Sequence, residues 1–240
     1  MNANARTRPI VAIDGPAGAG KSTVARRLAD ALGYVLVDTG AMYRAVALAA
    51  LRAGLAWSDE ARIGALLRDL IEQRALSFER DAAVGVGGVR GVRVSLSGCD
   101  VSNAIRTAEI AQGASLVSAH AEVRARLVDL QRQAARAGGV VLEGRDIGTV
   151  VFPDAEAKFF LTASPQVRAR RRYNELVANG QNVTFEQTLA DVKRRDAQDE
   201  GREVAPLKKA ETAILIDSTS MSIDETVAAM FVIVKKVQRE

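Results

Sequence analysis

The chain has 240 residues, of which 48% are hydrophobic and 26% charged, and its 33 basic and 29 acidic side chains give a formal net charge of +4. These proportions are ordinary for a globular protein, and no apolar run approaches the ~18 residues of a membrane span. The single cysteine and the single histidine, Cys99 and His120, exclude an intramolecular disulfide and a cysteine-cluster metal site. They also argue against a zinc site and a Ser-His-Asp hydrolase, and we expect His120 on the surface of a helix.

Arginine dominates the positive charge, because seven of the 33 basic residues are lysines, which leaves 26 arginines. Guanidinium groups match phosphate oxygens, so the excess suits a phosphate-handling enzyme, although GC-biased coding would also produce it. The pI near 9.4 could indicate nucleic acid, but aromatics are only 4%, and we expect no nucleic-acid partner. The polar residues 1–8 lack a signal peptide's apolar core, so a cytoplasmic protein with no membrane partner is expected. A monomer is the expected state.

A phosphate-binding loop is the clearest motif, because residues 15–22 match G-x-x-x-x-G-K-[ST] at every fixed position. The apolar run 10–13 predicts a buried strand before it, and residues 22–32 predict an amphipathic helix after it, ending at Gly33. Glycines let backbone N–H groups surround a phosphate, and the helix N-terminus adds positive charge. Lys21 should reach the outer phosphates of ATP, and Ser22 a Mg²⁺ ion. The expected ATP-binding residues are Gly15, Pro16, Ala17, Gly18, Ala19, Gly20, Lys21, Ser22 and Thr23.

Strands and helices alternate along the rest of the chain. Further buried strands are predicted at 34–37, 140–142, 158–161 and 213–216. Helices are predicted at 42–54, 58–71, 103–118 and 122–137, and three more begin after caps at Ser164, Thr184 and Ser222. Five apolar strands separated by helices predict an α/β fold with a mostly parallel, doubly wound sheet.

The segment 76–96 differs, because its apolar residues recur with a period close to two. Two short runs, 84–86 and 92–94, flank turn signals at Gly87, Gly88 and Gly91. We interpret the segment as a small antiparallel unit inserted into the α/β chain. It is either a hairpin without a role or part of a substrate lobe.

Polar residues follow two of the predicted strands, Asp38-Thr39-Gly40 after the second and Glu143-Gly144-Arg145-Asp146 after the third. Open α/β sheets bind ligands at the carboxyl ends of their strands, so both segments are candidate sites. The charged run 194–202 is either a solvated helix face or a flap that closes over a nucleotide.

Four segments together resemble bacterial cytidylate kinase, and they span residues 10 to 217. They are the loop at 15–23, Asp-Thr-Gly-Ala-Met-Tyr-Arg at 38–44, Gly-Arg-Asp-x-Gly-Thr-x-x-Phe-Pro at 144–153, and Arg-Asp-x-x-Asp-x-x-Arg at 195–202. The resemblance implies a P-loop NTPase-type five-stranded parallel sheet flanked by helices, with an inserted antiparallel lobe that binds a nucleoside monophosphate and a short lid. It places the core at 8–57, 138–165 and 204–240, the insertion at 58–137 and the lid at 166–203.

The resemblance also implies a reaction, the transfer of the γ-phosphoryl group of ATP to CMP or dCMP with Mg²⁺ as cofactor. By the family's pattern, Arg44, Arg145 and Arg202 grip the acceptor's phosphate, Ser115, Arg124 and Asp146 read cytosine, and Arg195 and Asp199 hold the ribose. Thr39 and Tyr43 complete the substrate-binding set, and the catalytic residues are Lys21, Arg145, Arg195 and Arg202. Asp38 or Glu143 orients water on the Mg²⁺ held by Ser22, or caps neighbouring backbone. The family commonly has Asp and Arg where this chain has Glu143 and Gln198.

The chemistry of cytosine supports this assignment independently, because a carboxylate accepts from its amino group and an arginine donates to its acceptor edge. Several of the residues have a simpler interpretation. Arg44 and Arg124 could be surface charges on helices. Arg168 and Arg172 either approach ATP from the lid or solvate a helix.

Three other functions remain open at this point. The chain could be another P-loop kinase, of shikimate or adenylate type, although the 76–96 insertion and the Gly144-Arg145-Asp146 segment favour cytidylate kinase. A nucleotide-dependent switch is a second alternative, but the Asn-Lys-x-Asp guanine reader of GTPases is missing from the sequence. A structural or nucleic-acid-binding role is the third, and its binding would weaken steeply with salt.

Overall fold

The computed structural model describes residues 6–80, 92–178 and 180–239. The chain divides into two compact units. The first unit comprises residues 1–34 and 137–240, and the second comprises residues 35–136. Among the described residues, the structure contains no helix that is both long and apolar enough to cross a membrane.

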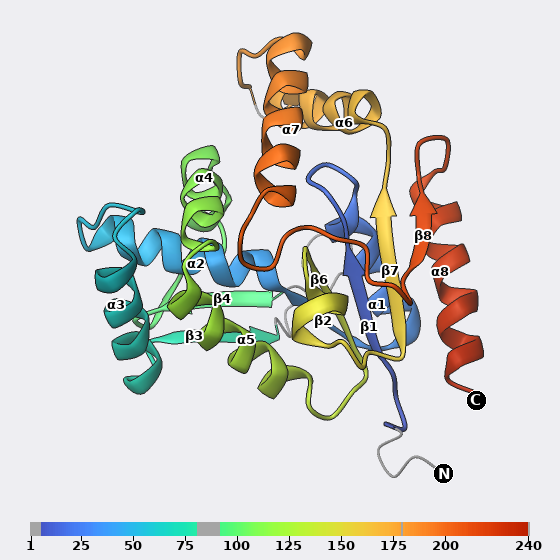
Figure 1. Ribbon diagram of the computed structural model, residues 1–240, viewed down its shortest axis with the longest axis horizontal. Helices are drawn as coiled ribbons and strands as arrows, with labels where there is room; N and C mark the ends of the chain where they lie inside the picture. Colours follow the sequence, from blue (N-terminus) through green and yellow to red (C-terminus); the bar gives the residue numbers. More distant parts are fainter. Residues whose placement is uncertain (1–5, 81–91, 179, 240) are drawn as a thin grey trace. The chain divides into compact units, whose positions relative to one another are not determined.

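The first unit is built on a parallel sheet, shown in Figure 1. Its central strand β1 (Ile10–Asp14) pairs in parallel with β6 (Val140–Gly144) on one side and β7 (Ala157–Thr162) on the other, and β7 pairs in parallel with β8 (Ile214–Asp217). The sheet has five strands in the order β2-β6-β1-β7-β8, and its edge strand β2 (Val35–Asp38) is formed by the first residues of the second unit. The predicted α/β fold is therefore confirmed, and its strands lie within one or two residues of the predicted ranges.

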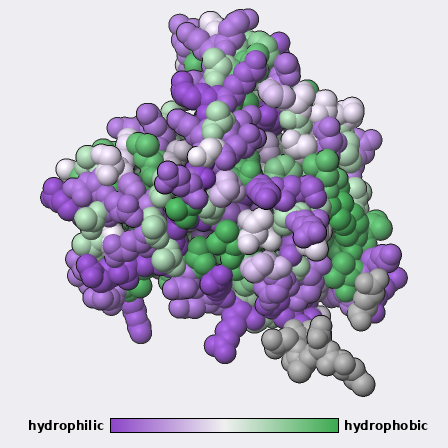
Figure 2. All heavy atoms as spheres, in the orientation of Figure 1, coloured by the Kyte–Doolittle hydropathy of each residue, from purple (hydrophilic) through white to green (hydrophobic). Residues whose placement is uncertain are grey.

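Burial explains which strand is central. All five residues of β1 are buried, whereas β8 at the edge leaves Ile214 and Leu215 exposed. Figure 2 shows hydrophobic side chains gathered over the region of β8 and α8 (Ile223–Val237). Helix α1 (Lys21–Leu32) packs on β6 and α8 through a buried stripe at helical spacing and ends at Gly33, which has φ 65°.

Two further helices of the first unit, α6 (Pro165–Ala178) and α7 (Phe185–Glu200), pack on each other (Figure 1). The predicted capping boxes are confirmed, with Thr184 and Gln187 at the start of α7 and Ser222 and Glu225 at the start of α8. The hydroxyl of Ser164 accepts from the N–H of Val167 at 3.3 Å, as its predicted capping role requires. Between β6 and β7 lies η2 (Ile147–Val151), a single wide turn of π-helical type that the sequence did not predict.

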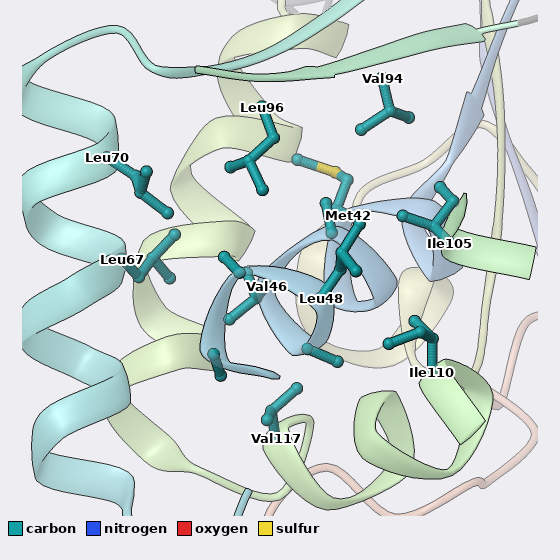
Figure 3. Close-up of a cluster of buried hydrophobic side chains, with 14 of the residues drawn as sticks. Met42, Val46, Leu48, Leu67, Leu70, Val94, Leu96, Ile105, Ile110 and Val117 are labelled. Atoms are coloured by element: carbon teal, nitrogen blue, oxygen red, sulfur yellow. The ribbon is translucent and has the colours of Figure 1, made fainter. Parts of the chain in front are cut away.

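The second unit surrounds α2 (Thr39–Arg52), an Ala-rich helix with nine buried residues. Around it lie the helices α3 (Glu60–Glu72), α4 (Ala108–Val117) and α5 (Ala121–Ala135), the short 3₁₀ turn η1 (Ala104–Arg106), and the strands β3 (Leu76–Arg80), β4 (Val92–Leu96) and β5 (Cys99–Asp100). Figure 3 shows the core that these elements share, with side chains from α2, α3, α4, β4 and η1 pointing toward one another. The labelled residues are Met42, Val46, Leu48, Leu67, Leu70, Val94, Leu96, Ile105, Ile110 and Val117.

The predicted antiparallel unit is confirmed where the structure describes it. β3 pairs antiparallel with β4, from Leu76 opposite Leu96 to Arg80 opposite Val92, and β4 pairs antiparallel with β5. The predicted run 84–86 and the turn signals Gly87, Gly88 and Gly91 lie outside the described residues.

Two predictions in the second unit were wrong in detail. The helix predicted at 103–118 is interrupted, because Thr107 has extended backbone and its hydroxyl accepts from the N–H of Ile110, which starts α4 anew. His120 is not a surface helix residue. It precedes α5, its side chain is only 12% exposed, and a ring nitrogen lies 2.7 Å from the carbonyl oxygen of Trp57.

Candidate active site

The loop between β1 and α1 has the backbone that phosphate binding requires. Gly15 has φ 149°, and a Cβ there would lie 1.9 Å from the carbonyl oxygen of Leu161, so no larger residue fits. Gly20 has φ 90° and supplies no side-chain cap to α1. The first N–H groups of α1 and the positive end of its dipole are therefore left for an anionic ligand.

Lys21 is the first residue of α1 and is buried, with its ammonium donating to the carbonyl oxygen of Pro16 at 2.7 Å. Burial, and next the positive charge of Arg145, lower the pKa of Lys21 to about 7, although the carboxylates of Glu143, Asp199 and Asp14 oppose the shift. A bound phosphate would add negative charge beside the ammonium and favour its protonated form. Binding of a polyphosphate would therefore raise the pKa of Lys21 and keep its ammonium group charged.

Two of the predicted metal residues, Ser22 and Glu143, are in direct contact in the first unit. The Ser22 hydroxyl donates to the Glu143 carboxylate at 2.8 Å, and this carboxylate is buried at the end of β6. Hydroxyl and carboxylate oxygens suit a hard cation such as Mg²⁺. Asp38 is engaged within the second unit, where it caps α2 by accepting from the N–H of Ala41 and pairs with Arg44 at 2.9 Å.

A charge cluster of Arg145, Asp199 and Arg202 lies at the end of β6 and the end of α7. One oxygen of Asp199 accepts from Arg145 at 2.7 Å, and the other contacts Arg202 at 2.6 Å. Burial alone would raise the pKa of Asp199, but the charges of Arg145 and Arg202 and the hydrogen bond from Arg145 outweigh it and hold this pKa below its ordinary value. The same charges act on Arg195. Burial is the largest cause of its lowered pKa, and the positive charge of Arg145 is the second. The structure thus brings together four of the predicted substrate residues.

Asp146 follows Arg145 directly and is buried at the start of η2. The two N–H groups that come next in the chain, those of Ile147 and Gly148, donate to the carboxylate of Asp14. Asp14 is a residue that the sequence analysis missed. A carboxylate ending a fully buried strand, immediately before the phosphate loop, was the signal that could have identified it.

The predicted substrate residues of the second unit are held by local contacts. The ion pair of Arg44 with Asp38 lies beside Gly40. A Cβ at this position would lie 2.9 Å from the guanidinium, so the glycine leaves room for the pair. Thr39 is buried in the first turn of α2, and Tyr43 packs against the hydrophobic core of this unit.

Arg124 in α5 is buried, so the surface-charge interpretation of this residue was wrong. Its guanidinium donates to the carbonyl oxygen of Ser118, and the Ser118 hydroxyl donates to the carbonyl oxygen of Ser115. The turn between α4 and α5 thus places Ser115 and Arg124 in one hydrogen-bonded segment.

Arg168 and Arg172 of α6 differ in their surroundings. Arg168 is buried, donates to the carbonyl oxygen of Ala17 in the phosphate loop at 3.1 Å, and pairs with both oxygens of Asp196 on α7 at 2.7 and 2.8 Å. Arg172 pairs with Glu175 on the surface of its own helix. The run 194–202 is only partly a solvated face, because Gln198 is exposed whereas Asp199 is buried.

Comparisons with known proteins agree with this geometry. The family model described as cytidylate kinase matches residues 11–236. The cytidylate kinase of Geobacter sulfurreducens is 52% identical over 239 residues, covering 100% of this chain and 98% of that protein. The cytidylate kinase of Geobacter sp. strain M21 is 55% identical, covering 92% and 90%, and that of Syntrophotalea carbinolica is 53% identical, covering 96% and 93%. A family match over nearly the whole length, together with relatives more than 50% identical over at least nine tenths of the chain, shows that the chain belongs to the cytidylate kinase family.

Proposed function

We propose that this protein transfers the γ-phosphoryl group of ATP to CMP or dCMP, which yields ADP and CDP or dCDP. The observation that carries the proposal is the cluster of Arg145, Asp199 and Arg202, in which the charges of Arg145 and Asp199 act on the phosphate-loop lysine Lys21. Two arginines fixed on one carboxylate suit a reaction in which two phosphate groups must approach each other against their mutual repulsion.

The donor ATP is held by residues 15–23. Backbone N–H groups of the loop and of the first turn of α1 bind its phosphates, and Lys21 exchanges the carbonyl oxygen of Pro16 for the outer phosphates. Ser22 and Glu143 are the residues that would hold Mg²⁺, directly or through water. When bound, Mg²⁺ supplies charge neutralisation on the phosphates of ATP.

The acceptor requires no general base, since the phosphate of CMP is already an anionic nucleophile. One of its oxygens attacks the γ-phosphorus, the bond from that phosphorus to the β–γ bridging oxygen breaks, and ADP leaves with the electron pair. Arg44, Arg145 and Arg202 bind the acceptor's phosphate and offset its charge. Asp199 holds the guanidinium groups of Arg145 and Arg202 in place, so less ordering remains for the moment of reaction.

Cytosine recognition is assigned to Asp146, which accepts from the amino group, with Arg124 and Ser115 on the acceptor edge. Arg195 and Asp199 bind the ribose, and Thr39 and Tyr43 complete the substrate set. Uracil presents a carbonyl where cytosine presents the amino group, so it would set an acceptor oxygen against the buried Asp146 carboxylate, which repels it. The protein is further proposed to act as a cytoplasmic monomer on small-molecule substrates, with neither membrane nor nucleic acid as a partner.

The test offers ATP and Mg²⁺ with CMP, dCMP, UMP, AMP or shikimate, one at a time, and measures ADP formation. Turnover should be strong with CMP and dCMP and weak with the other three. Lys21→Ala should fold normally and lose at least about 100-fold in turnover, since a group that stabilises transition-state charge is removed. Lys193→Ala, an exposed lysine of α7, is the matched control and should keep full activity. Preferred turnover with AMP or shikimate would overturn the acceptor assignment, and an active Lys21→Ala enzyme would overturn the role of the loop.

A further inference from the structure

We propose that Asp14 is a positioning residue for the acceptor site: its carboxylate fixes the backbone that carries Arg145 and Asp146, without itself touching a substrate. The inference rests on the proposed roles of Arg145 and Asp146. It assigns a function to a buried acid that lies outside the phosphate-loop pattern.

The geometry of the contact is specific. Asp14 ends β1 opposite Gly144 of β6, and its side chain is buried. One carboxylate oxygen accepts from the N–H of Ile147 at 2.8 Å and the other from the N–H of Gly148 at 2.7 Å. These are the first two residues of η2, so the carboxylate binds the backbone directly after the Arg145-Asp146 pair.

The contact also involves the start of η2, where a capping side chain would ordinarily bind. An aspartate in front of a helical turn ordinarily caps that turn with its own side chain. Asp146 stands in this position before η2 but makes no capping hydrogen bond. The N–H groups of Ile147 and Gly148 donate instead to Asp14 of the neighbouring strand.

Gly148 allows the close approach. A Cβ at this position would lie 3.4 Å from an oxygen of Asp14 and 3.3 Å from Cδ of Lys158, which is tighter than side chains ordinarily pack. The charged groups that face Asp14 are Lys21 from α1 and Asp146 from the start of η2. Burial, with a smaller contribution from the charge of Asp146, raises the pKa of Asp14 to about 6. The two N–H donors and the charge of Lys21 act in the opposite direction but do not cancel this rise. The acid is therefore held in a site that disfavours its charge, as expected of a residue kept for function rather than for stability.

The first experiment compares Asp14→Asn with the wild-type protein in steady-state kinetics. The amide can accept only one of the two N–H groups, and it turns a donor toward the other. The KM for CMP should rise about tenfold, the effect of one lost buried hydrogen bond, and the preference for CMP over UMP should narrow. The KM for ATP should change little, and the melting temperature should not fall.

The matched control is Asp217→Asn. Asp217 also ends a parallel strand and accepts a backbone N–H, that of Thr219 at 2.9 Å, but it is exposed and is not one of the proposed acceptor residues. It should leave both KM values unchanged. Equal rises of the two KM values in Asp14→Asn, or no change in either, would overturn the positioning role.

A second measurement needs no variant. In the wild-type protein, the amide proton and nitrogen signals of Ile147 and Gly148 should shift together with a midpoint near pH 6 as Asp14 ionises. Signals of Ile147 and Gly148 that do not respond to pH anywhere between about pH 3 and pH 8 would overturn the contact itself. Asp146→Ala, assayed in parallel, distinguishes failure of the proposed function from failure of this inference. If this variant keeps the wild-type preference for CMP over UMP, the proposed role of Asp146 is wrong. The amide titration does not depend on that result and reports only whether Asp14 holds the backbone of Ile147 and Gly148.

Discussion

Asp14 and Lys21 are two buried charges whose pKa values both move toward neutrality. Burial raises the first to about 6 and lowers the second to about 7, and each charge partly offsets the shift of the other. Such shifts cost stability, because the folded protein must ionise groups that water would solvate better. They also couple the protonation of Lys21 to ligand binding, since anionic phosphates favour the charged form of the lysine.

The pH dependence of stability tests the raised pKa of Asp14. The ordinary value is 3.8 and the folded value about 6, so ionisation costs the folded state at pH 7, and this cost disappears as the pH falls below the ordinary value. The free energy of unfolding of the wild type, relative to Asp14→Asn, should therefore fall by about 2 kcal/mol between pH 4 and pH 7. Urea unfolding of both proteins across this range measures the difference.

Asp217→Asn again supplies the control. The hydrogen bonds from Thr219 lower the pKa of Asp217, so its wild-type carboxylate should favour the folded state as pH rises, the opposite sign. Parallel stability curves for wild type and Asp14→Asn would contradict the shifted pKa of Asp14.

At the scale of elements, Arg168 joins three parts of the first unit. It bonds to the phosphate loop at Ala17, to the carbonyl oxygen of Ala163 at the end of β7, and to Asp196 on α7. Helix α7 also carries the proposed substrate residues Arg195 and Asp199. The guanidinium of Arg168 therefore connects the phosphate loop to the helix on which these residues lie. A second contact between the helices, Arg170 of α6 over the ring of Phe185 at 4.1 Å, lies outside this network.

Arg168→Lys should loosen α7, since an ammonium cannot replace a guanidinium that pairs with both oxygens of Asp196 and donates to two carbonyl groups. We expect the free energy of unfolding to fall by about 2 kcal/mol and proteolysis within 185–202 to accelerate. Arg172→Lys, at a surface pair with Glu175, is the control and should change neither. Equal proteolysis rates for the two variants would contradict the anchoring role of Arg168.

Local signals explain which elements could be predicted from the sequence. The capping boxes at Thr184 and Ser222 and the left-handed Gly33 depend on residues within one turn, and each appears where it was predicted. The break at Thr107 is also local, but the apolar pattern runs across it and concealed it. The contact of His120 with the carbonyl oxygen of Trp57 joins residues 63 positions apart, so it could not be predicted from a local pattern.

At the scale of the whole molecule, the order of strands and helices was predictable and the contacts between side chains were not. Four sequence segments identified the residues of the phosphate loop, the start of α2, the end of β6 and the end of α7. The partnership of Arg145 with Asp199, 54 positions apart, needed the tertiary structure, as did that of Arg168 with Asp196. Asp14 was missed for the same reason, because its partners, Ile147 and Gly148, lie more than a hundred residues later.

The proposed function depends on recognition of cytosine through the carboxylate of Asp146. It is tested by the ratio of kcat/KM for CMP to that for UMP, measured in wild type, Asp146→Ala and the control Asp69→Ala, an exposed aspartate of α3. The wild type and the control should share a strong preference for CMP, and Asp146→Ala should narrow this preference by about tenfold or more, because the acceptor for the amino group is removed. An unchanged ratio in Asp146→Ala, or a wild type that does not distinguish the two nucleotides, would show that Asp146 does not recognise the base.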